Sequence, residues 1–271
     1  MTYLDIDGHP TWVEDRGSGD TVMLLHGGLS DSDLLLDTLA PVLGSFRVVA
    51  FDRRGHGRTA DRPGPFSYDE MATDAVAVLR AVEAPGPTHL VGYSDGAIVA
   101  LLVAQARPDL VRSVVLIGAN FHHRGLLPEI ALVREDDPMT GVVRDAYGER
   151  SPDGVDHFTE VLAKTLQLWA GQPTLETEDL AGIDVPALVL VGDDDAMTLS
   201  HTCALYESLP QGQLAVVPGA SHLVVLEKPG PVGDLVTAFL SDPSPPGTFM
   251  PMRRHPAGGV SPPMTGDGGP A

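Results

Sequence analysis

The chain has 271 residues, which is long for an average domain but ordinary for a single α/β domain. Its 37 acidic and 17 basic residues give a formal net charge of −20, which argues against sequence-independent binding to nucleic acid or to an anionic membrane. Cys203 is the only cysteine, so the sequence excludes a disulfide framework and a thiolate metal site.

The N-terminal residues, Met1 to Trp12, lack the basic and apolar regions of a signal peptide. No stretch of the sequence reaches the ~18 consecutive apolar residues that suggest a membrane span. We therefore expect a soluble, cytoplasmic protein.

Seven short runs are predicted to be β-strands. Several of them are nearly continuous stretches of valine, leucine and isoleucine, which is typical of parallel strands covered on both faces. The predicted strands are Thr11 to Glu14, Thr21 to Leu25, Phe46 to Phe51, Thr88 to Gly92, Ser113 to Ile117, Ala187 to Val191 and Gln213 to Val217.

Segments with helical spacing alternate with these runs, so the sequence predicts an α/β fold with a mostly parallel sheet and helices on both faces. The predicted helices are Asp33 to Leu43, Tyr68 to Val82, Gly96 to Ala106, Ser200 to Leu209 and Val232 to Leu240.

The alternation of strands and helices stops between residues 121 and 182. This stretch has helical patches, notably Gly154 to Ala170, and no convincing strand, which favours a helical cap over two ordinary crossover helices. Residues 1–120 and 183–242 would then form the core. From 243 to 271 the chain is rich in proline and glycine and predicts a disordered tail.

Ser94 lies in the pentapeptide Gly92-Tyr93-Ser94-Asp95-Gly96, between a predicted strand and a predicted helix. A strand that turns sharply into a helix holds its central residue in a strained conformation and needs small residues on both sides. The pattern is that of a nucleophile elbow, with the serine hydroxyl exposed above the N-terminus of a helix.

A serine hydroxyl needs a base, and the base needs a carboxylate that fixes its tautomer. The strand that begins at Ala187 ends in Asp193-Asp194-Asp195, and a later small-residue loop ends in His222. Any of the three aspartates is a candidate partner of His222. A metal site on the three aspartates is the other interpretation, but no histidine lies near them at ligand spacing.

Five motifs in this order resemble the α/β-hydrolase fold family, from about Thr21 to Leu240 without the cap. The match is to a serine hydrolase of the biphenyl-hydrolase-like and esterase–lactonase branch. The motifs are Leu25-His26-Gly27-Gly28, Asp52-Arg53-Arg54-Gly55-His56-Gly57, the elbow, Gly192 to Asp195, and the His222 loop before Glu227-Lys228-Pro229.

The resemblance implies that Ser94 is the nucleophile, His222 the general base and Asp195 the orienting carboxylate. It places the oxyanion hole at the backbone N–H groups of Gly28 and Asp95. The Asp95 side chain is either a partner for a substrate ammonium or hydrogen-bonded within the elbow. Trp169, in the cap, is a further candidate for substrate binding.

The resemblance favours hydrolysis of a small-molecule carboxylic ester through an acyl-enzyme, without a cofactor or metal. The same residues serve lactonases, carbon–carbon bond hydrolases and haloperoxidases of the perhydrolase type, and Asp95 adds amino-acid ester hydrolysis as an alternative. The alternative of another class is a non-catalytic ligand-binding protein that has kept the fold.

Overall fold

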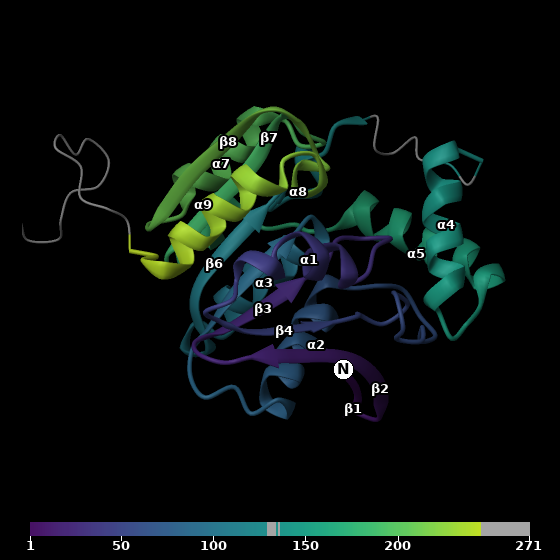
Figure 1. Cartoon of the computed structure of the whole chain (residues 1–271). Helices are drawn as coiled ribbons and strands as arrows, with labels where there is room; N and C mark the ends of the chain where they lie inside the picture. The colour runs from purple at the N-terminus through teal and green to yellow at the C-terminus, as the bar shows by residue number, and fades with distance from the viewer. Residues whose placement is uncertain (129–133, 135, 245–271) are drawn as a thin grey trace, which may run out of the picture.

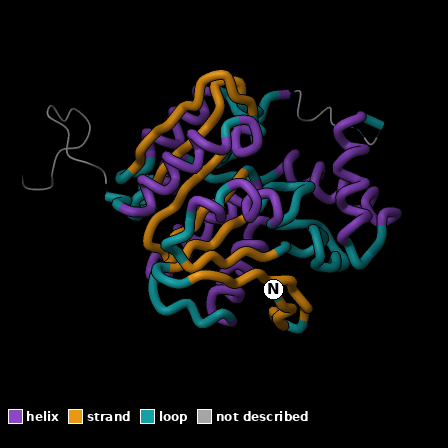
Figure 2. Tube along the Cα trace, viewed as in Figure 1, coloured by secondary structure: helices purple, strands orange, loops and turns teal. Residues whose placement is uncertain are grey.

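The computed structural model describes residues 1–128, 134 and 136–244. They form one eight-stranded sheet in the spatial order β1-β2-β4-β3-β5-β6-β7-β8 (Figures 1 and 2). The strands are β1 (Thr2–Ile6), β2 (His9–Gly17), β3 (Thr21–Leu25), β4 (Arg47–Phe51), β5 (Thr88–Tyr93), β6 (Val111–Ile117), β7 (Ala187–Asp194) and β8 (Gly212–Ser221).

The six strands from β3 to β8 are parallel, and β1 and β2 are antiparallel to their neighbours. Every residue of β3 and β5 is buried, as expected for strands with helices on both faces. The predicted mostly parallel sheet is therefore confirmed. Because the six parallel strands run in one direction, their carboxyl ends lie at one edge of the sheet. The residues that follow β3, β5, β6 and β7 therefore lie at this edge.

Strand β1 was not predicted from the sequence. It pairs with β2 across a two-residue turn, in which Asp7 has φ 50° and Gly8 has φ 79°. An Asp-Gly pair between two extended segments is a strong hairpin signal, because this turn needs positive φ at both central residues. The signal was present, but β1 is an exposed edge strand without a continuous apolar run.

Two apolar layers cover the sheet, and alternate residues of each strand contribute to opposite layers. Met23 and Leu25 face the layer that contains α2 and α3, whereas Val22 and Leu24 face the layer that contains α1 and α9. The helices of the core are α1 (Asp33–Thr38), η1 (Ala40–Val42), α2 (Tyr68–Ala81), α3 (Asp95–Ala106), η2 (Pro108–Leu110), α7 (Leu199–Ser208), α8 (Val224–Glu227) and α9 (Pro229–Ser241).

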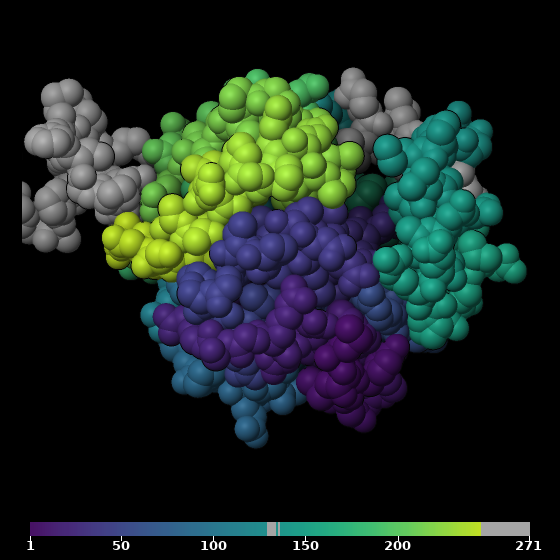
Figure 3. Space-filling view, viewed as in Figure 1, coloured from purple at the N-terminus to yellow at the C-terminus, as the bar shows by residue number. Residues whose placement is uncertain are grey.

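Helical segments separate β6 from β7, and the two longest lie to one side of the sheet (Figure 1). Figure 3 shows a recess between α4 and the surface formed around α1 and α8. The sequence indicated the helix at Gly154 to Ala170 but not α4. The segments are η3 (His123–Gly125), α4 (Pro138–Arg150), η5 (Val155–His157), α5 (Phe158–Gly171) and α6 (Thr177–Leu180).

Parts of two predicted regions lie outside the described residues. They are residues 129–133 and 135 of the predicted cap, and residues 245–271 of the predicted disordered tail. Within the described ranges, no helix is long and apolar enough to cross a membrane.

Candidate active site

Ser94 lies at the sharp turn between β5 and α3, with φ 53° and ψ −121°. A Cβ atom on Gly92 would lie 2.2 Å from the Gly96 carbonyl oxygen, and one on Gly96 would lie 2.0 Å from the Leu25 carbonyl oxygen. Only glycine fits at either position. The two glycines therefore permit the close approach of strand and helix that leaves Ser94 in a strained conformation.

Hydrogen bonds connect Ser94, His222 and Asp195 in one chain. The His222 Nε2 atom is 3.0 Å from Ser94 Oγ, and its Nδ1 atom is 2.8 Å from Asp195 Oδ1. With Nδ1–H donating to the buried carboxylate, Nε2 is free to accept the serine proton. The structure thus brings together the serine, histidine and aspartate that the sequence selected.

The three consecutive aspartates have different environments. Asp195 is buried against His222, whereas Asp193 and Asp194 are exposed. Asp193 Oδ1 accepts hydrogen bonds from the backbone N–H groups of Gly219 (2.7 Å) and Ala220 (3.2 Å). Asp193 therefore fastens the loop that carries His222, and Asp195 contacts its ring.

Three further residues hold His222, and the sequence reasoning did not single them out for that role. The Tyr93 hydroxyl donates to the His222 carbonyl oxygen (3.1 Å), and Glu227 accepts from the backbone N–H of Ser221 (2.6 Å). Gly118 has φ +59°, and a Cβ there would lie 2.9 Å from His222 Cε1. Their positions in the sequence could have identified two of them, because Tyr93 directly precedes Ser94 and Gly118 directly follows β6.

The predicted oxyanion hole lies beside Ser94. A Cβ on Gly27 would be 3.3 Å from Ser94 Cβ, and Asp95 is the first residue of α3. In the described part of the chain, no acceptor takes the backbone N–H of Gly28 or Asp95. Both N–H groups are therefore free to donate to an oxygen of a molecule bound at Ser94.

The Asp95 carboxylate is hydrogen-bonded within the site. Its Oδ1 atom accepts from the Tyr68 hydroxyl (2.8 Å) and from Trp169 Nε1 (2.9 Å), and the residue is 3% exposed. Burial and the Asp95 charge raise the pKa of Tyr68 well above its usual value, so the phenol stays a donor. Asp95 is thus hydrogen-bonded inside the protein, but its partners come from α2 and α5 and not, as the second of the two roles had it, from the elbow.

Trp169 reaches this site from α5. Its Cζ2 atom would lie 2.9 Å from a Cβ placed on Gly28, so the indole packs against the predicted oxyanion loop. The ring is partly exposed, and its N–H is used by Asp95. Trp169 therefore offers its apolar surface rather than a free donor to a bound molecule.

His26 and His56 are buried behind the site, and burial lowers the pKa of each, that of His56 to about 3. Both are neutral at pH 7 and lie within the core rather than in the chain of hydrogen bonds at Ser94. Among the described residues, no group of three His, Cys, Asp or Glu side chains could hold a metal ion.

A hollow of about 700 Å³ lies elsewhere, between β1, α2 and α3. Charged side chains such as Asp5, Asp69 and Arg80 line it, together with apolar residues of α2 and α3. Its lining includes neither Ser94 nor His222. The chemistry at Ser94 therefore gives the better basis for a function than the size of this hollow.

A family model described as the alpha/beta hydrolase family matches residues 22–235. A non-heme haloperoxidase of Rhodococcus erythropolis is 30% identical over 254 residues, covering 80% of this chain and 90% of that protein. The meta-cleavage product hydrolase of Pseudomonas fluorescens IP01 has a similar structure, with a TM-score of 0.76, 22% identity, and coverage of 89% of this chain and 98% of that one. For the enol-lactonase of Burkholderia xenovorans LB400 the TM-score is 0.71 at 21% identity, with coverage of 89% and 100%. The chain belongs to the alpha/beta hydrolase family.

Proposed function

We propose that this protein is a serine hydrolase that cleaves a carboxylic ester of a small molecule through an acyl-enzyme. The unbroken chain of hydrogen bonds from Ser94 through His222 to Asp195 carries the proposal. A non-catalytic binding protein would have no need for three such groups at these distances.

The proposed reaction begins when Ser94 Oγ attacks the ester carbonyl carbon and His222 Nε2 takes the hydroxyl proton. The carbonyl oxygen becomes an oxyanion and accepts hydrogen bonds from the backbone N–H groups of Gly28 and Asp95. Collapse of this intermediate breaks the ester bond, and the imidazolium returns the proton to the departing alcohol. The Asp195 carboxylate holds the ring in position and stabilises the imidazolium.

Water completes the cycle. His222 removes a proton from a water molecule, whose oxygen attacks the acyl carbon of the Ser94 ester. The second oxyanion occupies the same hole, and its collapse transfers the proton from His222 to Ser94 Oγ and releases the carboxylic acid. Each turnover consumes one ester and one water and produces one acid and one alcohol.

The surroundings of Ser94 bear on the class of substrate. An amino-acid ester would need a carboxylate for its ammonium group, but Asp95 is buried and holds the Tyr68 and Trp169 donors. The indole of Trp169 presents an apolar surface beside Gly28. These contacts support a neutral ester or lactone over an amino-acid ester.

A panel of short-chain p-nitrophenyl esters and simple lactones tests the proposal, with the wild type and Ser94→Ala compared side by side. We expect turnover by the wild type and a loss of about 10⁴-fold or more in kcat in the variant. Ser241→Ala is the matched control, because Ser241 is a remote serine whose hydroxyl donates to the Thr237 carbonyl oxygen in its own helix, α9. Wild-type turnover that survives Ser94→Ala would refute the mechanism.

The similarity to a haloperoxidase supports a second candidate activity at the same serine. If hydrogen peroxide replaces water as the attacking molecule, the acyl group leaves Ser94 as a peracid, which then oxidises halide. Halide oxidation that needs both peroxide and a carboxylic acid, and that Ser94→Ala abolishes, would establish it. Halide oxidation equal in the variant would exclude this route.

A further inference from the structure

Arg53 is a buried cation directly behind the oxyanion loop. It follows β4, is 1% exposed, and its Nη2 atom donates to the Gly27 carbonyl oxygen at 2.8 Å. Among the described residues, its Nε and Nη1 atoms have no hydrogen-bond partner. An arginine that is buried without a direct carboxylate partner is costly, which calls for an explanation beyond packing.

The Gly27 carbonyl belongs to the same peptide group as the Gly28 N–H. A trans peptide is planar, with its C=O and N–H pointing in opposite directions, and the Gly27–Gly28 bond is not among the cis bonds of the chain. A donor that fixes the carbonyl from behind therefore fixes the direction of the N–H in front. A charged donor also pulls electron density toward the carbonyl and makes the N–H a stronger donor.

His26 supports the same carbonyl, and Arg53 sets its tautomer. The backbone N–H of Arg53 donates to His26 Nε2 at 3.1 Å, so the ring proton must be on Nδ1. His26 Nδ1–H then donates to the Gly27 oxygen at 2.7 Å. The contact of 3.3 Å between Arg53 Nη2 and His26 Nδ1 brings two donors together, and both are aimed at the one carbonyl.

The neighbour of Arg53 holds the other end of the same loop. Asp52 is fully buried, and its Oδ1 atom accepts from the backbone N–H of Ser32 at 2.9 Å. Two consecutive residues at the end of β4 thus fasten the loop between β3 and α1 before and after Gly28. Asp52 fixes backbone position, whereas Arg53 adds a positive charge behind the peptide.

We propose that Arg53 is a positioning residue that orients and polarises the Gly27–Gly28 peptide, so that the Gly28 N–H binds the oxyanion more strongly. The positive charge of Arg53 matters because the buried Asp95 carboxylate lies beside the same loop. The negative charge of that carboxylate repels an oxyanion bound at Gly28. Arg53 offsets that repulsion from the opposite side of the peptide. The inference rests on the proposed function of Ser94.

The test compares wild type, Arg53→Met and Arg53→Lys in two measurements. The first is kcat and KM on the best p-nitrophenyl ester. Removal of a whole oxyanion-hole donor lowers kcat by about 10²- to 10³-fold, so a weakened donor should lower it by about 10-fold in Arg53→Met, with KM almost unchanged. Arg53→Lys retains the charge and should recover part of the loss.

The second measurement is the carbonyl stretching frequency of the acyl-enzyme formed with an arylacryloyl imidazole, a preactivated acyl donor. A carbonyl held less strongly in the oxyanion hole absorbs at a higher wavenumber. We expect a shift to higher wavenumber in Arg53→Met and a smaller shift in Arg53→Lys. Arg54→Met is the matched control, since its neighbouring guanidinium bonds to Asp74 and not to the loop.

The outcomes separate the two proposals. If the wild type forms no acyl-enzyme, or forms the same one as Ser94→Ala, the proposed function fails. If acylation at Ser94 is normal but Arg53→Met keeps the wild-type frequency and kcat, the role of Arg53 is refuted. Should Arg53→Met not fold, Arg53→Gln takes its place, and an unchanged frequency there refutes the role equally.

Discussion

The edge of the sheet that carries Ser94 and the helices between β6 and β7 are held in place by different forces. In α3, which begins directly after Ser94, nine of the twelve residues are buried, almost all of them small or apolar. In α4, two of thirteen residues are buried, Thr140 and Tyr147. Apolar packing therefore fixes the edge of the sheet that carries Ser94 but provides little to hold α4.

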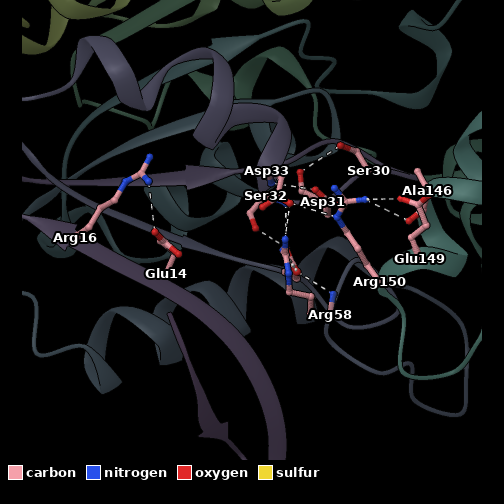
Figure 4. Close-up of polar contacts among 11 residues, drawn as sticks. Glu14, Arg16, Ser30, Asp31, Ser32, Asp33, Arg58, Ala146, Glu149 and Arg150 are labelled. Carbon is pink, nitrogen blue, oxygen red and sulfur yellow. Dashed lines mark hydrogen bonds and ion pairs between the residues drawn. The ribbon is translucent and has the colours of Figure 1, made fainter.

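Ion pairs hold the helices between β6 and β7 in place. Arg150, at the end of α4, forms ion pairs with Asp31 and Asp33 (Figure 4). The Nε–oxygen distances are 3.3 Å and 3.2 Å. Around α5, Asp61 accepts from Lys164 (2.6 Å) and His157 (2.8 Å). Because salt and pH weaken charge pairs more than apolar contacts, we expect the two regions to respond to different perturbations.

The largest effect is expected at the edge that carries Ser94, from Asp195→Asn. The amide cannot stabilise an imidazolium and favours the wrong tautomer of His222, so kcat should fall about 10⁴-fold with the fold intact. Steady-state kinetics and circular dichroism check this outcome. Asp194→Asn, one residue earlier and exposed, should be nearly silent. A kcat within about 10-fold of wild type in Asp195→Asn would contradict the assignment.

Gly118→Ala should come next. Its Cβ would meet the His222 ring at 2.9 Å in a backbone with φ +59°. A displacement of His222 by about 1 Å is expected to cost about 10²-fold in kcat, and the strained backbone about 1–2 kcal/mol in the free energy of unfolding. Gly8→Ala has a similar φ of +79° with no atom within 4 Å, so it should lose stability alone. Equal kinetics in the two variants would disprove the steric argument.

Asp61→Asn, unlike the two changes near Ser94, should lower mainly the free energy of unfolding and leave kcat almost unchanged. Among the described residues, the change leaves the buried Lys164 ammonium with only the more distant Glu160 (3.7 Å) as a carboxylate partner. We expect a loss of about 2–3 kcal/mol in the free energy of unfolding, measured by urea denaturation, and a rise in KM of a few-fold. The exposed neighbour Asp156→Asn is the control. A variant as stable as wild type would mean that this pair does not hold α5.

His56 makes the core itself sensitive to acid. Burial and the Arg53 charge lower the pKa of His56 to about 3 in the folded protein, against roughly 6.5 when unfolded. Between these values the unfolded chain binds more protons, so stability falls as pH falls below about 6.5. We expect His56→Gln to reduce the slope of unfolding free energy against pH by up to about 1.4 kcal/mol per pH unit between pH 6 and 4. Identical slopes in urea titrations would rule this out.

The smallest effect is expected from Arg150→Met. Arg150 is about one-third exposed, so its pairs with Asp31 and Asp33 should contribute about 1 kcal/mol at low salt and almost nothing near 1 M salt. Unfolding measured at both salt concentrations tests this. Arg144→Met, which removes a long and exposed pair with Asp145 on the same helix, should change nothing. A loss that persists in high salt would point to packing instead.

The comparison also explains what the sequence could predict. Several of the seven predicted strands were identifiable because continuous apolar runs such as Ala187 to Val191 are buried on both faces. The residues brought together at Ser94 were identifiable because glycines at fixed spacing mark the elbow and the Gly192 turn. Helix α4 was missed because Gly141 and Gly148 interrupt the helical sequence pattern and because few of its apolar residues face a core.

The contacts that join distant segments could not be read from local patterns. Tyr68 and Trp169 converge on Asp95 from positions 27 and 74 residues away, and neither carries a motif. In the sequence, the buried Arg53 is simply one of two adjacent arginines in a polar turn, and no local pattern indicates that it is buried. Its position behind Gly27 follows only from the pairing of β3 with β4.

The pairing of β6 with β7 has a consequence for the order of folding. Ile117 lies beside Leu190, although the whole segment that contains α4 and α5 separates them along the chain. Closing so long a loop carries an entropic cost, and contacts between distant residues slow folding, so β7 and β8 should dock late on a partly formed β1–β6 sheet. Ser94 lies in the part of the sheet that should form early, whereas Asp195 and His222 follow β7 and β8 and should reach their positions late. Enzymatic activity should therefore lag behind helix formation when the denatured chain refolds.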